Sequence, residues 1–269
     1  MPEAAGTGAL TRTFTALRSS GRRAFIPYIT AGDPEPARTV EVMQRLADAG
    51  ADVIELGIPF SDPLADGPTI QAASWRALQR GVDIEHVLRW TREFRDSRDT
   101  PVVLFTYVNP VLRFGSERFL ERAGAAGAAG LLITDLPVGE DESLETVLSA
   151  GDLDLVRLVA PTTPPARLTA VLAGARGFVY YISRTGVTGE RVDTRAELAA
   201  EIEGLRRHTS LPIAVGFGIS TPEQAATVAA VADGVIMGSA LVRTLEEEGL
   251  EAAADLARRV RAAIDGIRE

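Results

Sequence analysis

The chain carries eight short runs of apolar and β-branched residues, and amphipathic stretches of helical period separate them. This alternation is typical of a parallel sheet built from βα units, and eight such units can close into a barrel. The sequence therefore predicts an α/β fold, a single (β/α)8 TIM barrel. The expected strands are AFIPYI (24–29), DVIEL (52–56), VVLFTYV (102–108), GLLITDL (130–136), DLVRLVA (154–160), FVYYIS (178–183), PIAVGF (212–217) and GVIMG (234–238).

Further helical segments fit this plan. An extra N-terminal helix over residues 10–18 precedes the first strand and is expected to cover the bottom of the barrel, and residues 250–267 form the last outer helix. Capping boxes at 194–197 and 221–224 mark the starts of two others. A length of 269 residues would permit two domains, but one barrel of about 250 residues fits it and no linker divides the chain. We therefore expect one domain over residues 1–269.

Charge and apolar patterning exclude several classes of partner. The net charge of −9 predicts an acidic surface that repels nucleic acid and anionic membranes. The N-terminus lacks the features of a signal peptide, and no apolar stretch reaches about 18 residues. The sequence predicts a soluble, cytoplasmic protein that acts on a small molecule.

The scarcity or absence of some residue types excludes several catalytic mechanisms. The chain has no cysteine, which excludes thiolate catalysis, and its two histidines, His86 and His208, are too few and too far apart for a histidine zinc site, so we expect no metal. The chain also contains no lysine, which excludes an aldolase that works through a Schiff base.

The segment ELGIPFSDPLADGPTIQ (55–71) is the richest in polar residues at a strand end, where barrel enzymes place their active sites. Side chains alternate along a strand, so Glu55 should point into the barrel mouth while Ile54 and Leu56 face the helices. Burial would raise the pKa of Glu55 and suit it to acid-base catalysis. A structural ion pair with an arginine is the alternative interpretation.

Two aspartates follow Glu55 in a loop rich in proline and glycine. Asp62 and Asp66 are each compatible with an ordinary turn-forming role. Three carboxylates within twelve residues nevertheless exceed what a turn requires, so the loop is a second candidate for catalysis.

Two glycine turns predict an anion site after the last two strands. GFGIS (216–220) and GSA (238–240) stand where many barrels bind phosphate with backbone N–H groups at a helix N-terminus. Gly218 and Gly238 allow a ligand to approach the backbone closely, and Ser239 adds a hydroxyl donor. Either turn alone could be merely a turn.

The segment SRTGVTGERVD (183–193) is interpreted as a lid or as an ordinary surface loop. Tyr180 and Tyr181 end the preceding strand on opposite faces, so one of them should face the site. Other strand residues could supply an apolar wall, although such residues are by default core. They are Tyr28, Phe105, Tyr107, Leu132 and Phe217.

Several motifs strongly resemble the tryptophan synthase alpha subunit family. They are FIPYITAGDP, ADVIELGIPFSDPLADGPTIQ, YYISRTGVTG, VGFGIS and GSALV, which occur in the family's order over nearly the whole chain. The resemblance implies retro-aldol cleavage of indole-3-glycerol phosphate to indole and glyceraldehyde 3-phosphate, in L-tryptophan biosynthesis, with no cofactor in this chain. Departures are modest: Tyr28 stands where phenylalanine is common, and the lid continues as GERVD.

The resemblance also implies roles for individual residues. Glu55 would move protons at indole C3 and at the glycerol hydroxyl, Asp66 would accept a hydrogen bond from the indole N–H, and Tyr180 would lie near Glu55. Thr188 on the lid would orient Asp66. The phosphate would bind Gly189, Gly218, Gly238 and Ser239, and the indole would lie among Tyr28, Phe105, Tyr107, Leu132 and Phe217.

The implied partner is a beta subunit that carries pyridoxal phosphate, in an alpha2-beta2 complex. Residues 59–63 and the segment around Asn109 and Pro110 would form the interface. Three alternatives stay open: a stand-alone lyase that needs no beta subunit, an isomerase or synthase of a related phosphate-binding barrel, and a barrel that only activates a partner.

Overall fold

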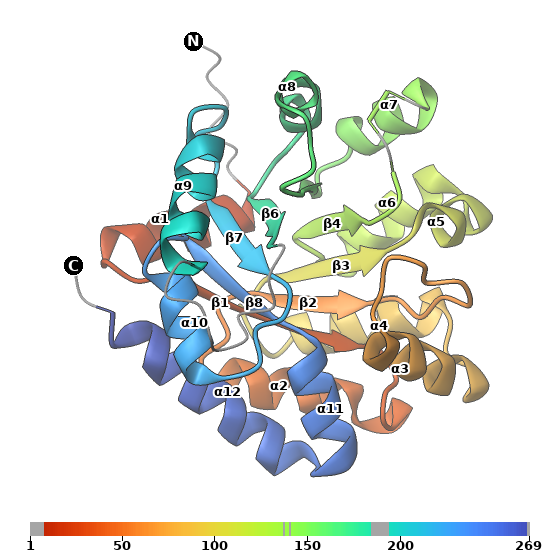
Figure 1. The fold of residues 1–269 in the computed structure, drawn as a ribbon. Coiled ribbons are helices and arrows are strands. Elements are labelled where there is room, and N and C mark those ends of the chain that lie inside the picture. The colour runs from red at the N-terminus through yellow and green to blue at the C-terminus, as the bar shows by residue number, and fades with distance from the viewer. Residues whose placement is uncertain (1–7, 137, 140, 184–193, 268–269) are drawn as a thin grey trace.

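Eight parallel strands form a closed barrel in the computed structural model, which describes residues 8–136, 138–139, 141–183 and 194–267 (Figure 1). Each strand pairs with its neighbours in sequence, and β8 pairs with β1. The predicted (β/α)8 barrel is confirmed. The strands are β1 (Ala24–Thr30), β2 (Ile54–Gly57), β3 (Val102–Thr106), β4 (Gly130–Ile133), β5 (Asp154–Val159), β6 (Val179–Ile182), β7 (Ile213–Gly216) and β8 (Gly234–Met237).

Helices surround this barrel in sequence order (Figure 1). None in the described part of the chain is long and apolar enough to cross a membrane. They are α1 (Ala9–Ser19), the 3-10 turn η1 (Pro36–Arg38), α2 (Thr39–Asp48), α3 (Pro68–Gln79), α4 (Ile84–Arg95), α5 (Val108–Phe114), α6 (Ser116–Ala125), α7 (Glu142–Ala150), α8 (Pro165–Ala173), α9 (Thr194–Arg206), α10 (Pro222–Ala229), α11 (Ser239–Glu247) and α12 (Leu250–Asp265).

Six of the predicted strands end one to three residues too late, because apolar character continues past the last ladder hydrogen bond, whereas the predictions for β1 and β2 end one residue too early. The largest overruns follow β3 and β4. The run 102–108 passes β3 because Val108 already begins α5, where its backbone N–H donates to the Asp135 carboxylate at 2.7 Å. The residues beyond each strand therefore form the loops at the carboxyl end of the barrel.

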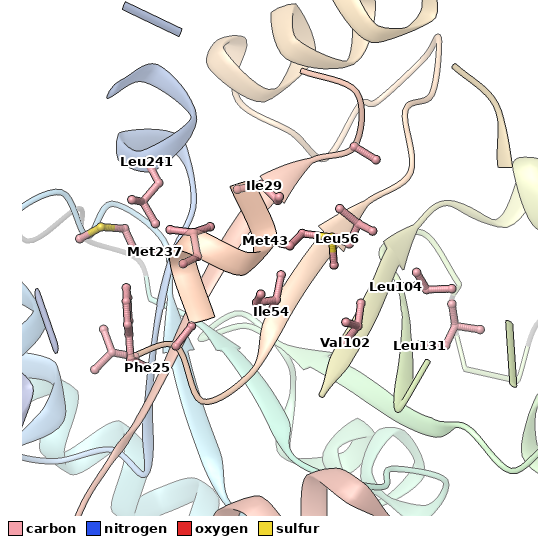
Figure 2. Close-up of a cluster of buried hydrophobic side chains, with 14 of the residues drawn as sticks. Phe25, Ile29, Met43, Ile54, Leu56, Val102, Leu104, Leu131, Met237 and Leu241 are labelled. Atoms are coloured by element: carbon pink, nitrogen blue, oxygen red, sulfur yellow. The ribbon is translucent and has the colours of Figure 1, made fainter. Parts of the chain in front are cut away.

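The strands separate two layers of apolar side chains. Figure 2 shows the outer layer, where Ile54 and Leu56 of β2 pack near Met43 of α2. Val53, by contrast, belongs to the inner cluster together with Val103. The predicted alternation along β2 is confirmed, and it directs the Glu55 side chain to the inside of the barrel.

Helix α1 closes the amino-terminal end of the barrel. Its buried residues Leu10, Phe14 and Leu17 belong to the inner cluster. A Cβ atom on Gly130, the first residue of β4, would lie 3.0 Å from the Leu10 side chain, so this end is tightly filled. The predicted N-terminal helix is confirmed, and its packing leaves the carboxyl end of the barrel as the open one.

The predicted capping box of α10 is confirmed. The Gln224 backbone N–H donates to the Thr221 hydroxyl at 3.3 Å, and the Thr221 N–H donates to the Gln224 side-chain oxygen at 3.2 Å. The other predicted box, at 194–197, borders residues outside the described part of the chain.

Candidate active site

A cavity of about 360 Å³ opens at the carboxyl end of the barrel. Residues from most of the strand ends and from the loops after β2, β7 and β8 line it. Nine of the predicted site residues are among them: Tyr28, Glu55, Asp66, Phe105, Tyr180, Phe217, Gly218, Gly238 and Ser239. Segments far apart in sequence are thus brought to one site.

Glu55 lies at the base of this cavity and is fully buried. Its backbone is in register with Tyr28 of β1 and Val103 of β3. Neither carboxylate oxygen has a hydrogen-bond partner in the described structure, so the alternative of a structural ion pair with an arginine receives no support there. Burial raises the pKa of Glu55 to about 8, which leaves the group protonated and able to donate a proton near neutral pH.

Asp66 stands on the loop between β2 and α3. The Tyr107 hydroxyl holds this loop by accepting a hydrogen bond from the Ala65 N–H at 3.1 Å, and the Gln71 amide donates to the Asp66 carbonyl at 2.8 Å. Burial raises the pKa of Asp66 to about 6, and a hydrogen bond with Tyr107 partly opposes the shift. The carboxyl group of Asp66 is therefore ionised at a pH where that of Glu55 is not, which is the pattern of an acid and an anion with separate tasks.

Tyr28 and Tyr180 line the cavity from β1 and β6, while Tyr181 packs in the outer layer as predicted. Burial raises the pKa of both tyrosines, so both keep the O–H proton. The negative charges of Asp66 and Glu55 add to this effect, with Glu55 the largest charge acting on Tyr180.

Two glycines that the sequence did not single out make room for these tyrosines. A Cβ atom on Gly57 would overlap the Tyr28 hydroxyl, and one on Gly216 would overlap the Tyr180 hydroxyl. Gly57 and Gly216 each end their strand, and a glycine at that position inside a barrel is the signal that could have found them.

The loops after β7 and β8 form the opposite part of the cavity. Phe217 has a φ of 92° and Gly218 a φ of 73°, so two successive residues adopt the left-handed region. Gly238 precedes the first turn of α11, whose N–H groups have no partners within the helix. A Cβ atom on Gly238 would lie 3.6 Å from the Tyr28 ring, an ordinary contact, so packing alone does not require a glycine there. Such an arrangement can accept an anion.

Two predicted residues, Leu132 and Tyr107, do not line the described cavity, and two others lie outside the described residues. Leu132 is fully buried in the inner cluster of the barrel. Tyr107 lies behind the Asp66 loop, where its ring packs against Phe60 at 5.2 Å. Gly189 and Thr188 lie outside the described residues.

The cavity wall also contains residues that the sequence did not indicate. Most are apolar side chains that alternation alone assigns to the core, and Arg243 is the charged exception. They include Ile70, Leu158, Ile182, Ile219, Ile236 and Arg243. Among the described residues, no three His, Asp or Glu side chains are grouped so as to hold a metal ion.

An ion network joins the two helices that flank the cavity. Arg76 of α3 contacts the buried Asp33 carboxylate through two hydrogen bonds of 2.7 and 2.9 Å, and it pairs with Glu246 of α11 at 2.7 Å. Because α3 follows the Asp66 loop and α11 follows Gly238, this network fixes the acidic side of the cavity relative to the glycine turns.

A second groove, of about 480 Å³, shares no lining residue with the cavity. Its walls include Pro59, Phe60 and Ser61 from one predicted interface segment and Pro110 from the other. Leu64 and Leu112 are 90% and 50% exposed. The two predicted interface segments therefore meet in space.

Comparison with known proteins identifies the family. The family model described as "Tryptophan synthase alpha chain" matches residues 14–266. The chain belongs to the tryptophan synthase alpha chain family. It is accordingly a lyase of tryptophan biosynthesis.

Individual members of this family are similar to this chain over nearly their whole length. The tryptophan synthase alpha chain of Synechococcus elongatus is 49% identical over 258 residues, which cover 96% of this chain and 97% of that one. The Laribacter hongkongensis alpha chain is 51% identical, with 94% and 95% covered. The crystal structure of the alpha subunit from Legionella pneumophila superposes with a TM-score of 0.89 at 39% identity, with 97% and 100% covered. The crystal structure of tryptophan synthase from M. tuberculosis superposes with a TM-score of 0.87 at 35% identity, and the match covers 96% of this chain and 100% of that one.

Proposed function

We propose that the cavity cleaves indole-3-glycerol phosphate to indole and glyceraldehyde 3-phosphate, with Glu55 and Asp66 as its catalytic residues. The protonated Glu55 would deliver its proton to indole C3, which breaks the aromaticity of the ring and leaves an indolenine with positive charge on nitrogen. Asp66 would accept a hydrogen bond from the indole N–H and stabilise that charge as it forms.

Cleavage then needs a base, and the Glu55 carboxylate left by the first step can serve as one. It would take the proton of the glycerol hydroxyl next to the ring. The bond between that carbon and indole C3 breaks, its electrons return to the ring, and the carbon becomes the aldehyde. Glu55 ends protonated, so the cycle consumes no proton. Tyr180, whose O–H group stays neutral, would orient Glu55.

The substrate would lie with its indole ring between the aromatic residues and its phosphate at the glycine turns. We assign the ring to Tyr28, Phe105 and Phe217, which line the cavity. Tyr107 and Leu132 would support this pocket from behind. We assign the phosphate to Gly189, Gly218, Gly238 and Ser239, and we keep Thr188 as the lid residue that orients Asp66.

The observation that carries this proposal is the buried, unpartnered Glu55 carboxyl group in the same cavity as a second carboxyl group of lower pKa. The test is indole release from indole-3-glycerol phosphate by the purified chain and by Glu55→Gln, which keeps the shape and removes the titrating proton. We expect the variant to lose at least about a hundredfold in kcat. Unchanged turnover would exclude an acid-base role for Glu55.

We also propose that the partner is a tryptophan synthase beta subunit, in an alpha2-beta2 complex in which the beta subunit holds the pyridoxal phosphate. The exposed leucines Leu64 and Leu112, together with the groove that Phe60 and Pro110 of the two predicted interface segments line, support this proposal. Adding a beta subunit should strongly stimulate indole release. A rapid release that ignores the partner would instead identify a stand-alone lyase.

Two broader proposals complete the assignment. We propose that residues 1–269 form one domain, which supports the cavity as a unit, and that the protein works in the cytoplasm. Cell fractionation with an antibody against the chain would test the second.

A further inference from the structure

The charges around the cavity are unbalanced for the substrate proposed above. Asp66 contributes a negative charge, whereas Glu55 stays protonated near neutral pH, and the chain as a whole has a net charge of −9. A phosphate monoester adds further negative charge. The backbone N–H groups of Gly218 and Gly238 can orient such an anion but carry no net charge of their own.

Arg243 is the one cationic side chain among the described residues that line the cavity. It lies on α11, four residues after Ser239, and residues four apart share one face of a helix. Side chains on a helix lean toward its N-terminus, which for α11 is the turn that holds Gly238 and Ser239, and all three residues line the same cavity.

The described fold gives Arg243 no other task. Arg243 is exposed, and within the described part of the chain it forms no hydrogen bond or ion pair, although Glu246 and Glu247 follow it at the spacings that usually pair on a helix. Glu246 pairs instead with Arg76, at 2.7 Å. Arg243 therefore remains available to a ligand in the cavity.

We propose that Arg243 binds the phosphate group of the substrate and supplies the positive charge that the glycine turns lack. This inference rests on the proposed function, since it assigns the phosphate to the same end of the cavity. A guanidinium group matches a phosphate in shape and can donate two hydrogen bonds to it. Because the phosphate is remote from the bond that breaks, the contact acts equally in the ground state and the transition state.

The test compares steady-state cleavage of indole-3-glycerol phosphate by the full chain with that by Arg243→Gln and Arg243→Lys. We expect Arg243→Gln to raise KM about tenfold or more, as for the loss of a charged hydrogen bond, with kcat changed less than about twofold. Arg243→Lys should recover part of the affinity, since it restores the charge without the planar geometry.

Arg259→Gln is the matched control. Arg259 is an exposed arginine of α12 that does not line the cavity and pairs with Asp255 at 3.3 Å, so the variant changes the net charge by the same amount. It should leave KM within about twofold, because an exposed ion pair contributes little. An equal rise of KM in both variants would overturn the proposal, as would a fall of kcat at constant KM in Arg243→Gln.

A binding experiment separates this proposal from the proposed function. Inorganic phosphate and glyceraldehyde 3-phosphate are titrated into the wild type and into Arg243→Gln by calorimetry, with glyceraldehyde as the probe without phosphate. A loss of affinity confined to the two phosphates supports the role of Arg243 even if the wild type released no indole. Equal affinity for them in both proteins would overturn it even if the wild type were active.

Discussion

Glu55 combines full burial, two unpartnered carboxylate oxygens and a pKa raised to about 8. Folding thus takes a group that ionises near pH 4.5 in the unfolded chain and holds it in its neutral form. Such a group favours the folded state fully below its unfolded pKa, and this stability is lost as the pH rises through the folded pKa. The wild type should become less stable between about pH 4.5 and pH 8.

Glu55→Gln removes this dependence because the amide does not ionise. We expect the variant and the wild type to be similar in stability near pH 4.5, and the variant to become the more stable one as the pH approaches 8. Urea denaturation at several pH values measures the difference. A constant difference across this range would contradict the raised pKa of Glu55.

The pH dependence of activity belongs to the same residues. Asp66, with a pKa of about 6, must be ionised, and Glu55, with a pKa of about 8, must be protonated when substrate binds. We expect kcat/KM to rise as the pH increases through about 6 and to fall above about 8. The Asp66→Asn variant should cleave the substrate much more slowly, and its kcat/KM should no longer fall as the pH drops below about 6. An acidic limb that persists in this variant would assign that titration to another group.

The backbone of Phe217, a residue that lines the cavity, has an unfavourable conformation that lowers the stability of the fold. Its φ of 92° is unfavourable for a side chain with a Cβ atom, and the residue is 56% exposed. Replacing Phe217 with glycine relieves about 1–2 kcal/mol of strain but adds about 0.5–1 kcal/mol of backbone entropy. We expect the free energy of unfolding to rise by no more than about 1.5 kcal/mol, while KM rises several-fold because the indole loses an aromatic contact.

Urea denaturation and steady-state kinetics measure the two effects of Phe217→Gly. Phe178→Ala is the control, because Phe178 is fully buried and its truncation should cost about 3–5 kcal/mol. If Phe217→Gly were as destabilising as Phe178→Ala, the exposed ring would have to be a structural element of the fold.

The sequence predicts the placement of a single side chain well where the alternation along a strand or the position in a loop determines its surroundings. Glu55 points inward because Val53 and Leu56 fix the two faces of β2. The sequence does not show which inward-facing side chains line the cavity, because packing decides this: Leu132 and Phe105 are register partners on neighbouring strands, yet only Phe105 lines the described cavity. It also missed Gly57 and Gly216, whose necessity comes from tyrosines on other strands.

At the scale of elements, the eight strands could be predicted because each combines apolar periodicity with a following turn. Their ends could not, because apolar residues continue past the ladder into α5 and into the loop after β4. Nor could the contact between α3 and α11, which depends on Arg76 meeting partners from two distant segments, Asp33 and Glu246.

Arg76→Met should test how far this contact supports the site. The Asp33 side chain is 1% exposed, so removal of its partner leaves a buried charge and should destabilise the fold by about 3–5 kcal/mol. Asp33→Asn combined with Arg76→Met should restore part of this loss, because the charge is then absent. Denaturant melts of the single and double variants measure the coupling. Simple additivity of the two changes would show that the pair does not interact.

At the scale of the whole molecule, one loop segment connects the cavity with the second groove. The segment 59–71 contributes to both, since Phe60 lines the groove and Asp66 the cavity. A partner that presses on Phe60 can therefore act on Asp66 through Tyr107, which packs against Phe60 and contacts the Asp66 loop. This route gives a physical reason why a beta subunit would stimulate cleavage.

Leu112→Asp tests that assembly without touching the cavity. Leu112 is 50% exposed on α5, beside the groove residues Pro110 and Arg113, so a charge there should weaken an apolar interface and leave the fold intact. We expect indole release by the variant alone to equal that of the wild type, and the beta-subunit concentration for half-maximal stimulation to rise about tenfold or more. Glu121→Gln, a change on α6 away from both openings, is the control and should leave that concentration unchanged. If Leu112→Asp were stimulated as readily as the wild type, the partner would have to bind another face, and the route through Phe60 and Tyr107 would fail with it.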